Sequence, residues 1–449
     1  MSDPSTVNPH YLDHVVGTTA SHVVEVTEDI VSGSGIKLLA KGARIDPAVR
    51  ERLLAHKLRK PLEDCLQVAD GVRADELPAL AEQLQQTWPA LEALSRPPDG
   101  TASVATSLGR LSLSGPVRSL LTVYARSRPG RLEHAVGVAM LALSLGRRLA
   151  PGEFDRHRDL ALAGLLHDVG ELYLDPAHLA AGGALPPDHW RQIVSHPLIG
   201  HRVLRHMDGA GPVVARSVLQ HHERLDGLGY PQGLAGADLP LDGQVLGVAE
   251  WLMGLLSGGI SPLLRAKLAS CVVPGEFSTE LLQAVAAARF QADGLPPLAP
   301  QDGALQQQRA VARAERIAAC LRRFRDQRPW IDERVAQARG PLQRALQAAV
   351  QRLERLQLSF VSAGLEIDAP RRLVDELVAL GDAALRQEIS QLLGEMEFRL
   401  RALERECLAR TGLLPPDDHR VMQDVVARLR DDAPDDAAHD AAQDAPAPA

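Results

Sequence analysis

Along most of the chain, apolar residues recur every three to four positions, which is the period of an α-helix with one buried face. The main exception is SHVVEVTEDIVSGSGIKLLAKGARI near the start, which alternates apolar and polar residues on both sides of the turn signal SGSG. This alternation predicts a small β-hairpin. The next segment, DPAVRERLLAHKL, predicts a helix that Asp46 caps and Pro47 opens. We therefore expect a mainly α protein with a small N-terminal α+β module.

The pattern divides the chain into five parts. Residues 1–70 form the α+β module, and residues 71–114 form a helical linker that ends in the loop SRPPDGTAS. Residues 115–260 form a central domain of helices broken by Gly and Pro, and all the chemically informative residues lie in it. Residues 261–430 are helical, and residues 431–449 cannot bury enough apolar surface to fold, so we expect a disordered acidic tail.

Helical periodicity in the C-terminal region returns in three runs, LQQQRAVARAERIAACLRRF, PLQRALQAAVQRLERLQLSF and RRLVDELVALGDAALRQEISQLLGEMEFRLRALEREC. They predict an antiparallel bundle or a coiled coil. Two alternatives stay open from the sequence. The helices either pair two chains into a homodimer or form a bundle that packs only on itself.

Composition and charge exclude several classes of protein. The formal charge is -8, and six Asp without Lys or Arg in residues 431–449 leave the rest near -2, so no basic surface for a nucleic-acid polymer is indicated. The four cysteines, at positions 65, 271, 320 and 407, form no CxxC pair. The N-terminus lacks a signal-peptide pattern, and no stretch approaches the ~20 apolar residues of a membrane helix. These features indicate a soluble, cytoplasmic protein.

Candidate metal ligands stand at successive helix ends of the central domain. His134 opens one predicted helix, ALAGLLHDVG closes the next with His167 and Asp168, SHPLIGHRVL begins another with His196, and VVARSVLQHH ends with His221 and His222. Neutral imidazole suits transition metals, and a carboxylate has two oxygens with which to bridge two ions. Asp168 is the natural bridge. Two ions ~3.5–4 Å apart hold the attacking and leaving oxygens of a phosphoester displacement, so the pattern indicates a hydrolase.

Most of the sixteen histidines do not belong to this pattern. Isolated residues are more often solvated or hydrogen-bonded than metal-bound, and we expect this of His22, His56, His157 and His439. A structural role is expected for the residues inside the central domain that fit no motif, His178, His189, His201 and His206.

The ordered set of His134, HDVG, SHP and HHERLDGLGYP resembles the HD-GYP family, a branch of the HD superfamily of metal-dependent phosphohydrolases. The resemblance covers residues 115 to 260, a third of the chain, and a weaker one covers the N-terminal module. It implies a helical bundle around two or three iron or manganese ions, and hydrolysis of the bacterial messenger cyclic di-GMP. It also implies a GYP loop that lines the substrate groove and can contact diguanylate cyclase (GGDEF) domains.

The resemblance assigns the metal ligands to His134, His167, Asp168, His196, His221 and His222, with Glu250 at the position of an Asp that starts a late helix in the family. Catalysis falls on His167 and Asp168, and substrate binding on Gly229, Tyr230, Pro231 and Glu171. Where some members of the family have a Glu one turn before the first His, this chain has Gly130, which favours two ions over three.

Three positions depart from the family's phosphate-binding residues. Glu171 stands where members usually have Lys, and Gly259 and Pro262 stand at the family's Arg positions. A carboxylate in place of a cation is expected to repel the substrate phosphates. The family's metal ligands are thus nearly all present, whereas its basic phosphate-binding residues are replaced.

In HHERLDGLGYP, we expect Glu223 and Asp226 to fix the loop by hydrogen bonds, Gly227 and Gly229 to allow the tight turn, and Pro231 to stiffen it. Tyr230 either stacks on a guanine or packs in the core. The sequence thus favours a metal-dependent phosphodiesterase for cyclic di-GMP or its linear dinucleotide. Two alternatives are a regulatory module that has lost turnover and a hydrolase of another phosphorylated metabolite.

Overall fold

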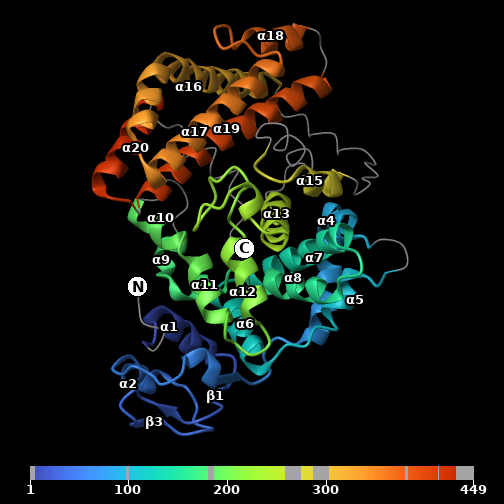
Figure 1. The fold of residues 1–449 in the computed structure, drawn as a ribbon. Coiled ribbons are helices and arrows are strands. Elements are labelled where there is room, and N and C mark those ends of the chain that lie inside the picture. The colour runs from blue at the N-terminus through green and yellow to red at the C-terminus, as the bar shows by residue number, and fades with distance from the viewer. Residues whose placement is uncertain are drawn as a thin grey trace.

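The computed structural model describes residues 6–97, 101–180, 187–257, 275–286, 303–379, 383–412 and 414–430. Helices dominate, as the sequence predicted. Figure 1 shows three layers from bottom to top: the N-terminal module, the central helices and the C-terminal helices. Among the described residues, no helix combines the length and the hydropathy needed to cross a bilayer.

The N-terminal module consists of α1 (Pro9–Thr18), β1 (Val24–Val26), β2 (Ile30–Val31), β3 (Lys37–Leu39), η1 (Pro47–Val49), α2 (Arg50–Leu54), η2 (Leu62–Cys65) and β4 (Leu66–Val68). The predicted hairpin is present but short, because it contains only β2 and β3. The strand before it, β1, pairs instead with β4, with Val24 opposite Val68, so both strands turn their apolar residues inward. Asp46 caps η1 as predicted, by accepting hydrogen bonds from the backbone N–H groups of Ala48 and Val49.

The linker and central helices are η3 (Ala74–Glu76), α3 (Leu77–Thr87), α4 (Pro89–Ser95), α5 (Val104–Leu108), α6 (Gly115–Ser127), α7 (Arg131–Leu149), α8 (Phe154–Leu166), η4 (Val169–Tyr173), α9 (Pro176–Ala180), α10 (Pro187–Ile193), α11 (His196–Leu204), α12 (Gly211–Gln220), η5 (Gly236–Asp238), α13 (Leu241–Ser257) and α15 (Thr279–Ala286). Helix α7 is buried along most of its length against α8 and α13, while α11 packs on α12. One continuous apolar core runs from Val7 to Val285. The division at residues 70 and 114 stays a prediction, because apolar packing is continuous across it.

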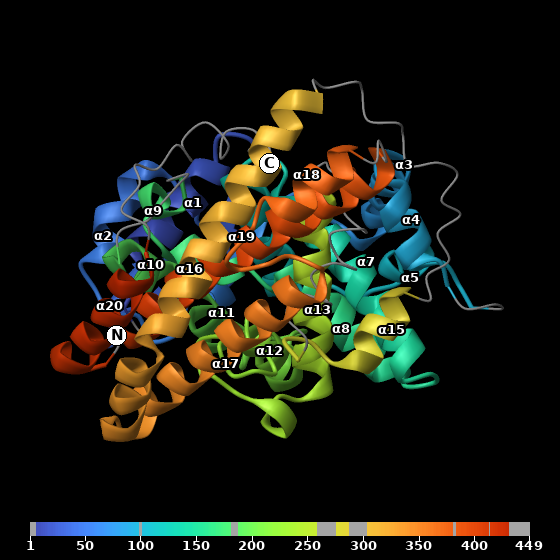
Figure 2. The same ribbon diagram turned by 90° about the horizontal axis from the view of Figure 1, so that it is seen from above.

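The C-terminal helices are α16 (Gly303–Gln337), α17 (Gly340–Ser362), α18 (Arg372–Ala379), α19 (Ala383–Thr411) and α20 (Pro416–Leu429). The first predicted run is longer than expected, because α16 continues through Pro329. Two apolar clusters hold these helices together. The bundle does not pack only on itself: Leu228 of the central domain belongs to its apolar core, and Figure 2 shows α17 and α19 lying across the central helices. The predicted tail at 431–449 lies outside the described residues.

Candidate metal centre

Seven predicted ligands come together where the ends of four central helices meet the middle of a fifth. His134 lies in the first turn of α7, His167 and Asp168 directly follow α8, and His196 opens α11. His221 and His222 directly follow α12. Glu250 lies in the middle of α13 rather than at a helix start, and one turn of α7 faces it there. All seven were named from the sequence.

The seven side chains form two adjoining donor groups, in each of which the potential ligand atoms lie within 4.8 Å of one another. The first donor group is His134, His167 and Glu250, and the second donor group is Asp168, His196, His221 and His222. In the first, Oε2 of Glu250 lies 3.0 Å from Nε2 of His134 and 3.1 Å from Nε2 of His167. In the second, the Nε2 atoms of His196 and His221 are 3.2 Å apart.

Asp168 connects the two donor groups through its two oxygens. Oδ2 lies 3.2 Å from Nε2 of His167 in the first group. Oδ1 lies 3.2 Å from Nε2 of His196 and 3.6 Å from Nε2 of His221 in the second. A carboxylate with one oxygen on each side has the arrangement that a bridging ligand of two cations requires.

Backbone hydrogen bonds orient three of the imidazoles. The Nδ1–H groups of His167, His196 and His221 donate to the carbonyl oxygens of Gly164, Ile193 and Val218, at 2.8, 2.7 and 2.6 Å. These bonds place the proton on Nδ1 and leave the Nε2 lone pair facing the centre, the tautomer in which imidazole binds a metal. The buried Nε2 atom of His167 lies within 3.2 Å of two carboxylate oxygens but forms a well-aligned hydrogen bond with neither, which fits an atom that faces an ion.

His222 and Glu250 have the protonation states that metal binding needs. Burial, together with the adjacent His221, holds the pKa of His222 well below the usual value, so His222 is neutral. Burial alone would raise the pKa of Glu250, but His134 and His167 hold it well below the usual value, so Glu250 is ionised. Imidazole and carboxylate side chains together form a donor set that fits divalent transition metals.

Gly170 allows η4, which follows the His-Asp pair, to pack directly against α11. A Cβ atom at position 170 would lie 2.1 Å from the carbonyl oxygen of His196 and 2.8 Å from the backbone nitrogen of Gly200. A side chain there would push His167 and Asp168 away from His196. The last residue of the HDVG motif is thus glycine for a steric reason.

The structure corrects the expected repulsion at Glu171. The carboxylate of Glu171 forms an ion pair with the guanidinium of Arg131, the first residue of α7, and Arg131 also lies 3.7 Å from Oδ2 of Asp168. A cation from the neighbouring helix therefore neutralises the carboxylate. Gly130 directly precedes Arg131 and has a φ of +80°, a conformation in which a side chain is strained. Gly259 and Pro262 lie outside the described residues.

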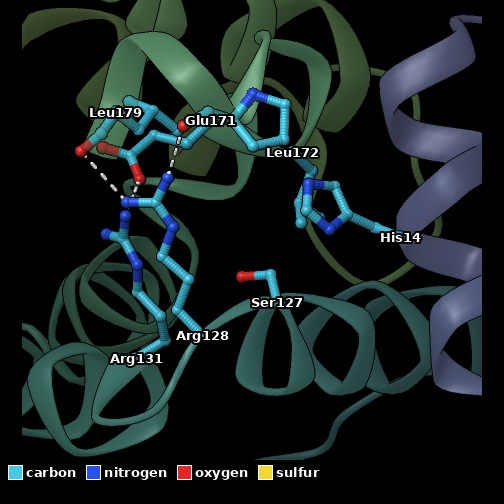
Figure 3. Close-up of a pocket in the computed structure, with 8 residues that line it drawn as sticks. His14, Ser127, Arg128, Arg131, Glu171, Leu172 and Leu179 are labelled. Atoms are coloured by element: carbon cyan, nitrogen blue, oxygen red, sulfur yellow. Dashed lines mark hydrogen bonds and ion pairs between the residues drawn. The ribbon is translucent and has the colours of Figure 1, made fainter. Parts of the chain in front are cut away.

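Arg128, Arg131 and Glu171 line a small cavity beside the donor groups, together with Ser127 and His14. Figure 3 shows both guanidinium groups on one side of this cavity, with Ser127 at the end of α6 and His14 reaching in from α1. Arg128 donates to the carbonyl oxygens of Pro176 and Leu179, at 2.9 and 3.1 Å. Neither arginine was among the residues predicted from the sequence. Arg131 precedes His134 by three residues and so shares its helix face, a spacing that would have indicated it.

The loop after His222 is fixed largely as the sequence predicted. The Glu223 carboxylate accepts three backbone N–H bonds, from Gln232, Gly233 and Leu234, and Asp226 accepts one from Leu228. Gly227 has a φ of +77°, and a Cβ at Gly229 would lie 2.3 Å from the Cα atom of Glu223, so both glycines are required.

Tyr230 packs beneath a metal-ligand candidate. Its ring stacks on the His222 imidazole, with ring centroids 4.6 Å apart, and meets Trp190 edge-on. Of the two alternatives for Tyr230, the structure shows packing within the protein. The peptide bond between Tyr230 and Pro231 is cis.

The other histidines lie outside both donor groups. The rings of His178 and His189 contact each other, with centroids 4.1 Å apart, and His157 bonds to the carbonyl oxygen of Ala150. His22, His56, His201 and His206 are likewise absent from both groups, and His439 lies outside the described residues.

Comparison with known proteins agrees with this geometry. The family model "HD domain" matches residues 118–267. The cyclic di-GMP phosphodiesterase response regulator RpfG of Xanthomonas campestris is 32% identical over 131 residues, which are 28% of this chain and 32% of that protein. A cyclic di-GMP phosphodiesterase of Pseudomonas aeruginosa is 36% identical over 108 residues, covering 24% and 26% of the two chains. A 3'3'-cGAMP-specific phosphodiesterase of Vibrio cholerae is 33% identical over 117 residues, covering 26% and 25%.

The chain thus spans about a third or less of the length of these relatives. A solved HDGYP protein from Bdellovibrio bacteriovorus has 19% identity, with 59% of this chain and 92% of that one covered, at a TM-score of 0.32. Residues 118–267 thus match an HD domain, and with its His-Asp and Gly-Tyr-Pro motifs this domain is similar to those of the HD-GYP branch.

Proposed function

We propose that the protein is a metal-dependent phosphodiesterase that hydrolyses cyclic di-GMP, or its linear dinucleotide, in the bacterial cytoplasm. One observation carries the proposal: seven donors form two adjoining groups that Asp168 connects through its two carboxylate oxygens. The relatives compared above are named as phosphodiesterases of cyclic dinucleotides, which supports the same reaction class.

The first donor group would hold one ion and the second donor group another, with Asp168 shared between them. Iron and manganese are the metals we expect, because both accept mixed imidazole and carboxylate ligands. The bound ions would supply the Lewis acidity that activates water and neutralises the charge of the phosphodiester. The chain's own contribution is to fix the imidazoles of His167, His196 and His221 by backbone hydrogen bonds and to keep His222 neutral by burial.

For substrate binding, we propose that the phosphate faces the cavity beside Arg131. Arg131 reaches within 3.7 Å of Asp168, so it is placed to contact a phosphate held at the metal centre, and Arg128 adds a second positive charge at the edge of the same cavity. In this proposal, Glu171 orients Arg131 instead of contacting the phosphate itself. Gly229, Tyr230 and Pro231 would form the opposite wall of the substrate groove, with Tyr230 supporting His222.

The test is turnover of cyclic di-GMP by the purified full-length protein, reconstituted anaerobically with Fe(II) or Mn(II). Linear dinucleotide and 3'3'-cGAMP serve as competing substrates, and Asp168→Ala serves as the matched inactive variant. The proposal predicts metal-dependent turnover that Asp168→Ala abolishes. A metal-loaded parent that hydrolyses none of the three dinucleotides would refute it.

Two outcomes would favour the alternatives. Full metal loading without turnover, combined with binding to a GGDEF domain, would indicate a regulatory module. One observation favours this alternative: the GYP loop contacts the C-terminal helices. Side chains of α19 line a cavity together with Leu228, Tyr230 and Pro231 of the loop. Turnover of a general phosphoester, but not of a dinucleotide, would indicate a different metabolite. A homodimer through the C-terminal helices stays a prediction.

A further inference from the structure

A buried ion cluster joins the GYP loop to the C-terminal helices. Arg352 of α17 is only 1% exposed, and its Nη2 and Nε atoms lie 2.7 and 3.2 Å from Oδ2 of Asp226 in the loop. Its Nη1 atom lies 2.7 Å from Oε2 of Glu406 on α19. One guanidinium therefore holds a carboxylate of the loop and a carboxylate of the bundle together.

Further contacts tie the same loop to the same helices. Leu228 is 1% exposed and lies in the apolar core formed by the C-terminal helices. Arg410 of α19 donates to the carbonyl oxygen of Gly227. The backbone N–H of Leu225 donates to the carbonyl oxygen of Glu276, and the side chain of Glu276 pairs with Arg399 of α19. The loop is thus anchored at both its polar and its apolar residues.

The other end of this loop is the metal centre. Asp226 follows His222 by four residues, the ring of Tyr230 stacks on the His222 imidazole, and the Tyr230 N–H donates to the His222 carbonyl oxygen at 3.1 Å. Any displacement of residues 223–231 therefore moves the support beneath His222. The described contacts run without a gap from Arg352 through Asp226 and the loop to a donor of the second group.

We infer that Arg352 is a positioning residue for the metal centre, which acts through Asp226 on the loop that holds His222. This inference rests on the proposed function insofar as the two donor groups bind metal. It makes the C-terminal helices part of the working metal site, because they supply the buried cation that the loop carboxylate needs. A buried carboxylate that loses its cation moves toward water or takes up a proton, and either change releases the loop.

The test measures metal affinity in the full-length protein. Arg352→Met keeps the length and apolar stem of the side chain but removes its charge. We expect this variant to bind one Mn(II) like the parent and the other about 10- to 100-fold more weakly, the range seen when a residue that supports a metal ligand is changed. Arg352→Lys keeps the charge without the two-pronged geometry and should fall between them. Titration followed by the electron paramagnetic resonance of free Mn(II) gives both affinities.

The matched control is Arg313→Met, which breaks the contact of Arg313 with Glu397, 3.2 Å apart, inside the C-terminal bundle. It should lower the melting temperature but leave both metal affinities at the parent's values. If Arg352→Met does not fold, Asp226→Asn takes its place, because it removes the same contact from the loop side while Arg352 keeps Glu406. The same loss of affinity for one ion is expected.

Parent-like affinity for both ions in a folded Arg352→Met or Asp226→Asn variant would overturn the inference. The same holds if Arg313→Met weakens one ion as strongly as Arg352→Met does, because the effect would then be general destabilisation. A parent that binds two ions but hydrolyses no dinucleotide refutes the proposed function and leaves this inference intact. A parent that binds no ion refutes both.

Discussion

The ion pair between Arg131 and Glu171 makes a quantitative prediction about the cavity beside the metal centre. The two side chains are 18% and 14% exposed, and burial raises the pKa of Glu171 above its usual value. Arg131→Met removes the cation but keeps a side chain of similar length. The carboxylate of Glu171 is then left in the cavity wall without its partner.

Arg131→Met is expected to lower the free energy of unfolding by about 3 kcal/mol. Removing one partner of a buried ion pair typically costs about 3–5 kcal/mol, and this pair keeps some contact with solvent. Glu171→Gln should cost less, about 1–2 kcal/mol, because Arg131 still reaches the Tyr124 hydroxyl at 3.3 Å and Asp168 at 3.7 Å. The double variant leaves neither charge alone, so it should resemble Glu171→Gln. The magnitude of the coupling energy then equals the loss in Arg131→Met, about 3 kcal/mol.

The parent, the two single variants and the double variant form a double-mutant cycle, which calorimetry measures on metal-loaded protein. The metal is present so that Asp168 keeps its positive partners in every variant. A loss of about 3 kcal/mol corresponds to a fall of roughly 6–12 °C in melting temperature for a domain of this size. The matched control is a cycle on the exposed pair of Arg325 and Asp368, where solvent screening should leave little coupling. A coupling below about 0.5 kcal/mol at Arg131 and Glu171 would refute the reasoning, since such values are typical of screened surface pairs.

Three further predictions follow from individual residues. Asp168→Ala removes the carboxylate that connects the two donor groups, so elemental analysis should find at most one transition-metal ion per chain, and two retained ions would contradict the bridging role. Gly170→Ala places a Cβ 2.1 Å from the His196 carbonyl oxygen and should lower the melting temperature sharply with loss of metal, whereas Gly254→Ala, with nothing within 4 Å, should not; equal effects would exclude the steric reason. Burial raises the pKa of Glu63. Its protonated side chain therefore contributes stability that is fully present below the ordinary pKa of Glu and is lost as pH rises through the raised value. Glu63→Gln should lack that part of the pH dependence, and a pair of identical stability profiles between pH 4 and 8 would contradict it.

The histidines and Asp168 of the two donor groups could be located from the sequence because they lie in local motifs at helix ends. His167 and His221 follow helices that end at recognisable positions, and His196 precedes a proline that suits a first helical turn. Helix ends are set by neighbouring residues in the chain, so their positions show in the sequence. The predicted hairpin, the Asp46 cap and the long C-terminal helices follow from equally local patterns. The pairing of β1 with β4 did not show, because it joins strands some forty residues apart.

The sequence by itself thus determined the mainly helical fold, the helix ends and the seven donors, since periodicity, capping and motif spacing act over a few residues. The tertiary structure decided what surrounds those donors. Arg131 neutralises Glu171 from another helix, and Arg352 reaches Asp226 across 126 positions of sequence. Such pairs form only when packing brings distant segments together and removes water, because ion pairs are weak in solvent and strong when buried. The sequence therefore shows where charges are, and only the fold decides which of them meet.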